Sequence, residues 1–448
     1  MHLAIQKIIF QININPATTE VIMRDNLRNN FRIFVICLTV IFGMDVSYAE
    51  CGPNINEGIQ KIIDENRIKY QIPGLEVSVS CPSEDVPRDF VSGTTTIGGA
   101  VLVQSDHLFQ IGSETKSFIA AVILQLEAEG RLSIYDPIGK YLKNIPDVWQ
   151  SVTIQQLLNH TSGIFNYTQV LEFWQAMKDG DFKNQWSSDE LIGFAKDKEL
   201  NFSPGLGWSY SNTNYVLAGM LVQSVTGKSI EEELNTRLLQ PLHLSNTHYY
   251  SQAYSDDVLQ RMAHGYSSFG VFSDEPKDIT DKNMSWGNAA GALVSTSHDT
   301  AIWLRHLLTD NKLLADTQRQ ELISIVDMEN GQFLPPESNK MGYGLGVVKF
   351  NSPAGGYWGH AGGTLGFISH MYWLKCNDVV ITVIVNHIDK SEIDGLGSSA
   401  IALDLINFIQ QSDTTKQCRT GLMPGKQPLS KQLKLINDLD KLVPKRSM

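Results

Sequence analysis

The order of strand and helix patterns along this 448-residue chain constrains its fold more than any other feature. Alternating apolar residues at 75–79, after a helix-like stretch at 55–70, predict a strand near the start. Strand patterns then return only late and in series, at 343–348, 366–373 and 379–385. The segment at about 131–284 between them is mostly helical and loop-like. The two ends of the chain therefore have to supply one sheet together.

We expect an α/β (α+β) fold, with an antiparallel sheet built from the N- and C-terminal parts and flanked by helices. A mostly helical domain is inserted at about 131–284, and a last helix is expected at about 393–410. A binding site would then lie in the cleft between the two parts. The net charge of −12 argues against nucleic acid as a partner, and no 20-residue apolar span indicates a polytopic membrane protein.

The N-terminal segment has the features of an export signal. An apolar run at 33–44 is followed by small residues at 47–49, and three basic residues precede the run: Arg24, Arg28 and Arg32. We predict a signal peptide at 1–49, in which 1–22 fit a mis-assigned start upstream of Met23, and an exported, periplasmic or secreted protein. An uncut membrane anchor is the alternative.

Export would place four cysteines in an oxidising compartment, because Cys37 falls within the signal. Chain proximity favours pairing Cys51 with Cys81 and Cys376 with Cys418, and free buried cysteines are the alternative. None of the four has the C-x-x-C spacing of metal ligands, so we expect neither a metal nor a cofactor.

The tail at 412–448 differs in composition from the body at 50–411. It carries eight basic residues against three acidic ones, and its leucines are spaced for one amphipathic helix. A solvated, loosely docked appendage is one interpretation, and peripheral contact with a membrane is the other.

A tetrapeptide of the form S-x-x-K places Ser113 and Lys116 one helical turn apart. The apolar stretch 117–126 continues as a helix that Gly130 ends. A serine hydroxyl needs an adjacent base, and a lysine whose pKa is lowered by burial can act as one. Backbone N–H groups at the start of a buried helix also favour a developing oxyanion.

Two further motifs supply partners for this serine. In the first, Tyr210 and Asn212 stand two residues apart, so that a phenol and an amide can point the same way. Lysine charge beside a phenol can depress its pKa and make it a base. The second is a run that begins with a histidine and ends in glycines, which allow close approach to the backbone: His360, Ala361, Gly362 and Gly363.

With these motifs the chain resembles the serine β-lactamase and penicillin-binding-protein superfamily. The likeness covers about 55–410 and is greatest for the branch of class C β-lactamases, D-alanyl-D-alanine carboxypeptidases and related esterases. It extends to three blocks outside the motifs: 157–164, 290–296 and 341–346. No G-x-S-x-G motif is present, which counts against an α/β-hydrolase.

The resemblance implies a role for each motif residue. Ser113 would be the acylated nucleophile, Lys116 would help to deprotonate it, and Tyr210 would be the partner base and the proton donor to the leaving group. Backbone N–H groups of Ser113 and Gly363 would form the oxyanion hole. The remaining residues would bind substrate: Asn212, His360, Ala361 and Gly362.

The resemblance places His360 on the strand that edges the cleft, where the family often has lysine. With His-Ala-Gly in place of K-T-G, this position resembles the carboxypeptidase-like branch and some esterases and peptidases more. A hydrogen bond to Tyr210 without substrate contact is the alternative role. We interpret His160, in a His-Thr-Ser-Gly segment, as a structural residue that holds a loop beside the cleft.

The motifs predict a serine hydrolase and the N-terminal segment predicts export; the resemblance implies carboxypeptidase-like activity on D-Ala-D-Ala cell-wall peptides. A class C-like β-lactamase or a carboxylesterase would use the same acyl-enzyme chemistry, and the deacylation rate separates them. The expected partner is a small peptide, β-lactam or ester substrate. The remote alternative is an inactive protein that binds peptidoglycan or a partner.

Overall fold

A computed structural model describes most of the chain between residues 55 and 412. Within that range it leaves out 83, 269–274, 352–355 and 390–396. The predicted signal and the tail beyond 412 lie outside the described residues, as do Cys51 and Cys418. Cys81 and Cys376 are each disulfide-bonded, and their predicted pairing with Cys51 and Cys418 stays a prediction.

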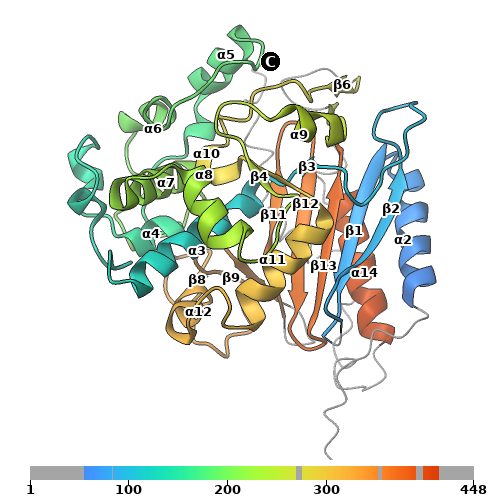
Figure 1. Cartoon of the computed structure of the whole chain (residues 1–448). Coiled ribbons are helices and arrows are strands. Elements are labelled where there is room, and N and C mark those ends of the chain that lie inside the picture. The colour runs from blue at the N-terminus through green and yellow to red at the C-terminus, as the bar shows by residue number, and fades with distance from the viewer. Residues whose placement is uncertain (1–54, 83, 269–274, 352–355, 390–396, 413–448) are drawn as a thin grey trace, which may run out of the picture. The chain divides into compact units, whose positions relative to one another are not determined.

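A central antiparallel sheet joins the two ends of the described chain (Figure 1). Its strands run in the order β2 (Arg88–Gly93), β1 (Gly74–Ser80), β13 (Val379–Val385), β12 (Ile368–Leu374), β11 (Tyr357–Gly363), β10 (Val348–Phe350), β9 (Gly342–Tyr343) and β8 (Val326–Asp327). The N-terminal β1 pairs with the C-terminal β13, with Leu75 opposite Val385 and Ser80 opposite Val380. The predicted sheet from both ends of the chain is confirmed.

Helices cover both faces of this sheet. Figure 1 shows α2 (Ile55–Lys69) and α14 (Ser398–Ser412) on one face and α11 (Ser297–Thr309) on the other. Every residue of β1 and β13 is buried as a result. The buried Glu76 of β1 accepts a hydrogen bond from the Ser297 backbone N–H at 3.0 Å, which satisfies one of the free donors at the start of α11.

The segment between β2 and β8 holds the remaining helices and all but one strand of two small sheets. Capping boxes begin three of these helices, at Thr153, Ser187 and Ser229. The helices are α3 (Thr115–Ala128), α4 (Ile154–Leu158), α5 (Leu171–Asp179), α6 (Ser188–Lys196), α7 (Asn212–Thr226), α8 (Ile230–Leu234), α9 (Asp256–Arg261), α10 (Asn288–Gly291) and α12 (Asp316–Leu322). The small sheets have the orders β3 (Phe109–Gln110), β7 (Leu293–Ser295), β4 (His248–Tyr249) and β14 (His387–Ile388), β5 (Tyr266–Ser267), β6 (Lys277–Asp278).

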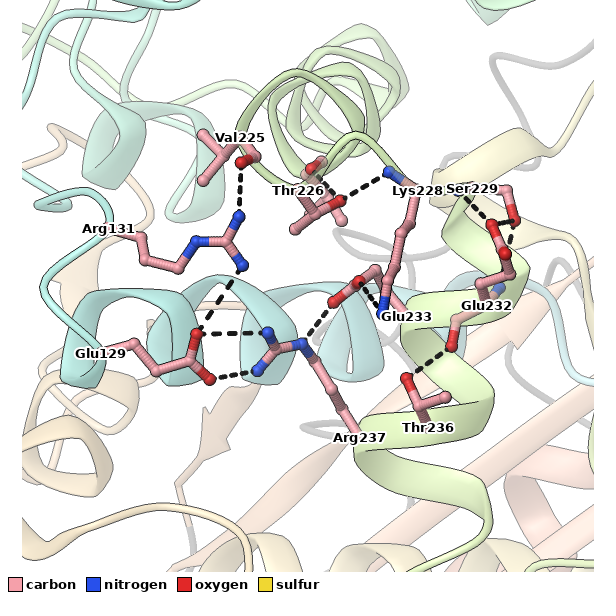
Figure 2. A network of polar contacts seen from close by, with 11 residues as sticks. Glu129, Arg131, Val225, Thr226, Lys228, Ser229, Glu232, Glu233, Thr236 and Arg237 are labelled. Carbon is pink, nitrogen blue, oxygen red and sulfur yellow. Dashed lines mark hydrogen bonds and ion pairs between the residues drawn. The ribbon is translucent and has the colours of Figure 1, made fainter.

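Helix α3 lies at the centre of the described chain, and most of its residues are buried. Short helical turns complete the part around it: η1 (Gly112–Glu114), η2 (Ile138–Lys140), η3 (Asp147–Trp149), η4 (Tyr167–Gln169) and the π-helical η5 (Asn235–Leu239). Beyond the last residue of α3, Glu129 meets Arg237 of η5 in the polar network of Figure 2. This network fixes the end of α3 that lies away from Ser113.

The expected strand at 343–348 is wrong, because the structure has two strands there. Strands β9 and β10 are separated by a turn in which Gly346 has a φ of +77°. A Cβ at Gly346 would lie 2.9 Å from the carbonyl oxygen of Lys116, so the backbone of α3 leaves room only for glycine. Pattern reasoning also missed β11 as a strand, because glycines interrupt its apolar alternation.

The last helix, expected from about 393, is described from Ser398. None of the helices in the described part of the chain is both long enough and apolar enough to cross a membrane.

Candidate active site

The nucleophile candidate lies in a tight turn at the start of α3. Ser113 occupies η1, a single 3₁₀ turn that leads directly into the helix. The preceding Gly112 has a φ of +49°, and a Cβ there would lie 2.7 Å from the backbone nitrogen of Gly363. Gly112 and Glu114 are buried while Ser113 is partly exposed. The turn therefore presents the serine beside strand β11.

Lys116 is fully buried and its ammonium group faces neutral oxygen atoms. Its Nζ donates to Ser113 Oγ at 2.9 Å, to Asn212 Oδ1 at 2.8 Å and to the Ala290 carbonyl at 2.7 Å. Burial lowers the pKa of Lys116 well below its usual value. A lysine in this state can give up its proton near neutral pH and accept one from a hydroxyl.

Tyr210 reaches the same serine from the segment before α7. Its hydroxyl donates to Ser113 Oγ at 2.8 Å, and Lys116 Nζ lies 4.8 Å from the centre of its ring. Ser211, the N-cap of α7, has an extended backbone with φ −143° and ψ 118°. An extended backbone sends side chains two positions apart to the same side, so Tyr210 and Asn212 both meet Lys116.

Asn212 is held in one orientation by a neighbouring loop. Its Nδ2 donates to Thr168 Oγ1 at 3.2 Å, and its backbone N–H donates to Asn166 Oδ1 at 3.1 Å. These bonds leave Oδ1 to accept from Lys116. The side chain is partly exposed. Its predicted contact with a substrate amide stays a prediction.

Strand β11 approaches the nucleophile turn at the distance of backbone contact. A Cβ at Gly362 would lie 1.9 Å from the carbonyl oxygen of Ile111, and Ser369 Oγ donates to that same oxygen at 2.9 Å. Ala361 and Gly362 are buried, whereas Gly363 is partly exposed. This approach brings Gly363 next to the turn of Ser113, as the predicted oxyanion hole requires. Its role in catalysis stays a prediction.

The structure does not bring the His360 side chain to Ser113. His360 is fully buried; its Nδ1 lies 2.6 Å from the Ala361 carbonyl and its Nε2 lies 2.9 Å from the Tyr343 hydroxyl. Because a carbonyl only accepts, Nδ1 carries the proton and the Tyr343 hydroxyl donates to Nε2. Burial, and secondly the charge of Lys116, lower the pKa of His360 to about 3. The imidazole is uncharged and engaged at both nitrogens, and its hydrogen-bond partner is Tyr343 where the alternative role expected Tyr210.

Sequence reasoning missed three contributors to this site: Thr168, Ala290 and Tyr343. Ala290 and Tyr343 lie inside the blocks 290–296 and 341–346 that contribute to the resemblance. The resemblance therefore pointed to these two segments but gave neither residue a role. Thr168 carried no such signal. Over the part of the chain that the structure describes, no group of three or more His, Cys, Asp or Glu side chains is placed to hold a metal ion.

Comparison with known proteins agrees with this geometry. The family described as Beta-lactamase matches residues 59–403. Penicillin-binding protein 4* of Bacillus subtilis is 28% identical over 60% of this chain and 58% of its own length, so the match spans little more than half of that relative. A D-stereospecific amidohydrolase from Streptomyces sp. is 28% identical with a TM-score of 0.65, covering 78% of this chain and 97% of that chain. The D-amino acid amidase from Ochrobactrum anthropi SV3, complexed with L-phenylalanine, is 27% identical with a TM-score of 0.68, covering 80% of this chain and 99% of that chain.

Proposed function

Because this chain belongs to the beta-lactamase family of serine hydrolases, we propose that Ser113 is the residue that its substrates acylate. One observation carries the proposal: Ser113 Oγ is hydrogen-bonded to both Lys116 Nζ, at 2.9 Å, and Tyr210 OH, at 2.8 Å. A serine hydroxyl becomes nucleophilic when an adjacent group can take its proton, and here two such groups are in place.

In the proposed acylation, Ser113 Oγ attacks the substrate carbonyl carbon while its proton passes to Lys116 or Tyr210. The low pKa of Lys116 supports a neutral amine that can accept this proton. Backbone N–H groups of Ser113 and Gly363 would stabilise the oxyanion. When the tetrahedral intermediate breaks down, Tyr210 would return a proton to the leaving amine, and water would later release the acyl group from Ser113.

For the substrate we propose an amide of a D-amino acid or of a short D-peptide. Two of the similar solved structures are a D-stereospecific amidohydrolase and a D-amino acid amidase. The uncharged, buried His360 supports an amide without a neighbouring carboxylate, because this position supplies no cation beside Ser113.

A carboxypeptidase acting on D-Ala-D-Ala peptides is the second candidate. The similarity to a penicillin-binding protein favours it. The two candidates differ in one chemical group, the free carboxylate next to the scissile bond. β-Lactams and esters would acylate the same serine in either case. The predicted export is likewise a proposal, which cell fractionation tests.

The test compares one D-Ala-D-Ala peptide in two forms, with its C-terminal carboxylate free and with that carboxylate amidated. Mass spectrometry over time follows acylation and product release, with penicillin and a p-nitrophenyl ester as further acyl donors. We expect faster hydrolysis of the amidated form and no acylation of Ser113→Ala. A preference for the free carboxylate would establish the second candidate. Wild-type protein that no acyl donor labels would contradict the enzyme proposal.

A further inference from the structure

We propose that His160 is a positioning residue that holds Tyr210 against Ser113. The inference rests on the proposed function, in which Tyr210 exchanges a proton with Ser113. It concerns a residue whose side chain touches neither the serine nor a surface, since His160 is fully buried. Three features of His160 hold Tyr210 in place: its bonds to the backbone beside the tyrosine, its ring contact and its fixed tautomer.

His160 binds the chain on both sides of Tyr210. Its carbonyl oxygen accepts from the Ser209 N–H at 3.1 Å, and its Nδ1 accepts from the Ser211 N–H at 3.2 Å. His160 thereby binds the N–H groups of the residues on either side of the tyrosine. Because a shift of either peptide would move the phenol, these two bonds set where its hydroxyl can reach.

The ring of His160 also packs directly against the phenol. The two ring centres are 4.4 Å apart, and the ring centre of Tyr343 lies 4.7 Å from that of the imidazole. The phenol hydroxyl, at the far end of the Tyr210 ring, donates to Ser113 Oγ. Backbone and ring of Tyr210 are thus held by the same neighbour.

A second layer of hydrogen bonds fixes the tautomer of His160. Ser162 Oγ donates to Asn214 Oδ1 at 2.7 Å, which turns Asn214 Nδ2 toward His160 Nδ1 at 3.2 Å. Nδ1 therefore faces two donors, Asn214 Nδ2 and the Ser211 N–H, and has to be an unprotonated acceptor. The proton lies on Nε2.

This arrangement works only while the imidazole is uncharged. Protonation of Nδ1 would set an N–H against two N–H donors and would remove the bond to Ser211. Burial, and next the charge of Lys116, lower the pKa of His160 well below its usual value. The bonds beside Tyr210 are therefore insensitive to pH in the neutral range.

The backbone of His160 also has an unusual conformation. Its φ is +64°, in the left-handed region that non-glycine residues rarely adopt. Asparagine tolerates this region better than leucine, and its Oδ1 can stand where the histidine Nδ1 accepts. The chain thus offers a matched pair, in which His160→Asn keeps the acceptor and His160→Leu removes it.

The experiment measures the rate of Ser113 acylation by a p-nitrophenyl ester in each variant, together with urea unfolding. We expect His160→Leu to slow acylation by about tenfold or more and His160→Asn to lose much less, because acylation follows the position of the base. In a Tyr210→Phe background the same His160→Leu change should slow acylation less than about twofold, since the group it positions is gone.

His370→Leu controls for the loss of any buried histidine. His370 is fully buried and hydrogen-bonds to Tyr372 and Ser398 at 3.0 and 2.9 Å. The His370→Leu variant should lose stability while its acylation rate stays near that of the wild type.

Equal losses from His160→Leu with and without Tyr210 would overturn the positioning role and leave the proposed function intact. A Tyr210→Phe protein that acylates at the wild-type rate would instead contradict the role of Tyr210 in the proposed function. If His160→Leu does not fold, His160→Asn and His160→Gln make the same comparison, because glutamine carries its amide one bond too far to replace Nδ1.

Discussion

A basic side chain lies at each end of helix α3, and the two differ in the groups that surround them. Lys116, in the first turn, is buried against three neutral oxygen atoms. Beyond the other end, Arg237 meets the carboxylates of Glu129 and Glu233, and Figure 2 shows them in one network. One end of α3 thus has a basic group among neutral oxygen atoms, and the other end lies beside a basic group that is paired with carboxylates.

The pKa shifts follow this difference. Burial lowers the pKa of Lys116, whereas the hydrogen bond to Glu129 raises the pKa of Arg237 and in return lowers that of Glu129. A cation that is poorly stabilised can release its proton, and one that is paired cannot. The serine end of α3 is therefore arranged for reactivity and the other end for stability.

Of the substitutions considered, Lys116→Met should have the largest effect on the acylation rate relative to its effect on stability. The acylation rate should fall by about 10²–10⁴-fold, because no base of the right pKa remains beside Ser113. The free energy of unfolding should change by only about 1 kcal/mol, because the desolvation cost that disappears offsets the hydrogen bonds that are lost. Burst kinetics and urea unfolding measure the two. A large fall in stability together with activity would contradict the reactive role of this end.

The glycines at the two ends offer a matched pair of substitutions. Gly112 and Gly130 both have a positive φ, of +49° and +71°, but only Gly112 has another backbone, that of Gly363, in the way of a Cβ. Alanine at either site should cost about 1–2 kcal/mol of stability through the backbone alone. Only Gly112→Ala should also lower kcat/KM, by about 10²-fold, because it displaces the turn from β11. Equal activities of the two variants would show that this contact does not matter for catalysis.

Replacing Arg237 with methionine should affect stability alone. Glu233 has a side chain only 3% exposed and would lose its arginine, so we expect a cost of about 2–4 kcal/mol in urea unfolding. The acylation rate should stay within about twofold, since Arg237 contacts nothing at the serine end. An acylation rate that fell with stability would show that the two ends are coupled through α3.

Features that depend on local spacing and on the apolar pattern could be predicted from the sequence. The S-x-x-K spacing placed Lys116 on Ser113, and the strand patterns at 75–79 and 379–385 correctly placed β1 and β13 in one sheet. Both are properties of a periodic chain, which a single sequence displays directly.

Features that depend on contacts between distant segments were not accessible in this way. The split between β9 and β10 follows from the backbone of Lys116 beneath Gly346, which no pattern near 346 reports. The burial of His360 likewise depends on Tyr343 from a neighbouring part of the sheet. A motif residue can be identified from sequence, but whether its side chain reaches the nucleophile is decided by the surrounding elements.

One carboxyl beside the second half of α3 is an exception to this comparison, and we expect a small effect from its replacement. Burial and the neighbouring carboxyl of Glu127 raise the pKa of Glu321, on α12, to about 7. A carboxyl whose pKa is raised by folding costs no stability below its unfolded pKa, and the cost grows as the pH rises toward 7. Glu321→Gln should therefore stabilise the protein at pH 8, by about 1–2 kcal/mol after allowance for solvent screening, and should have almost no effect at pH 4.5.

Glu129→Gln provides a control of opposite sign at the same end of α3. The hydrogen bond to Arg237 lowers the pKa of Glu129, so its ionised form stabilises the fold above its unfolded pKa and this contribution is lost as the pH falls. The glutamine variant should be slightly less stable than wild type at pH 8, because Glu129 is 43% exposed, and the difference should fade in acid. Thermal unfolding at the two pH values measures both variants. A shift of the same sign in both would show that pairing with Arg237 does not distinguish Glu129 from Glu321.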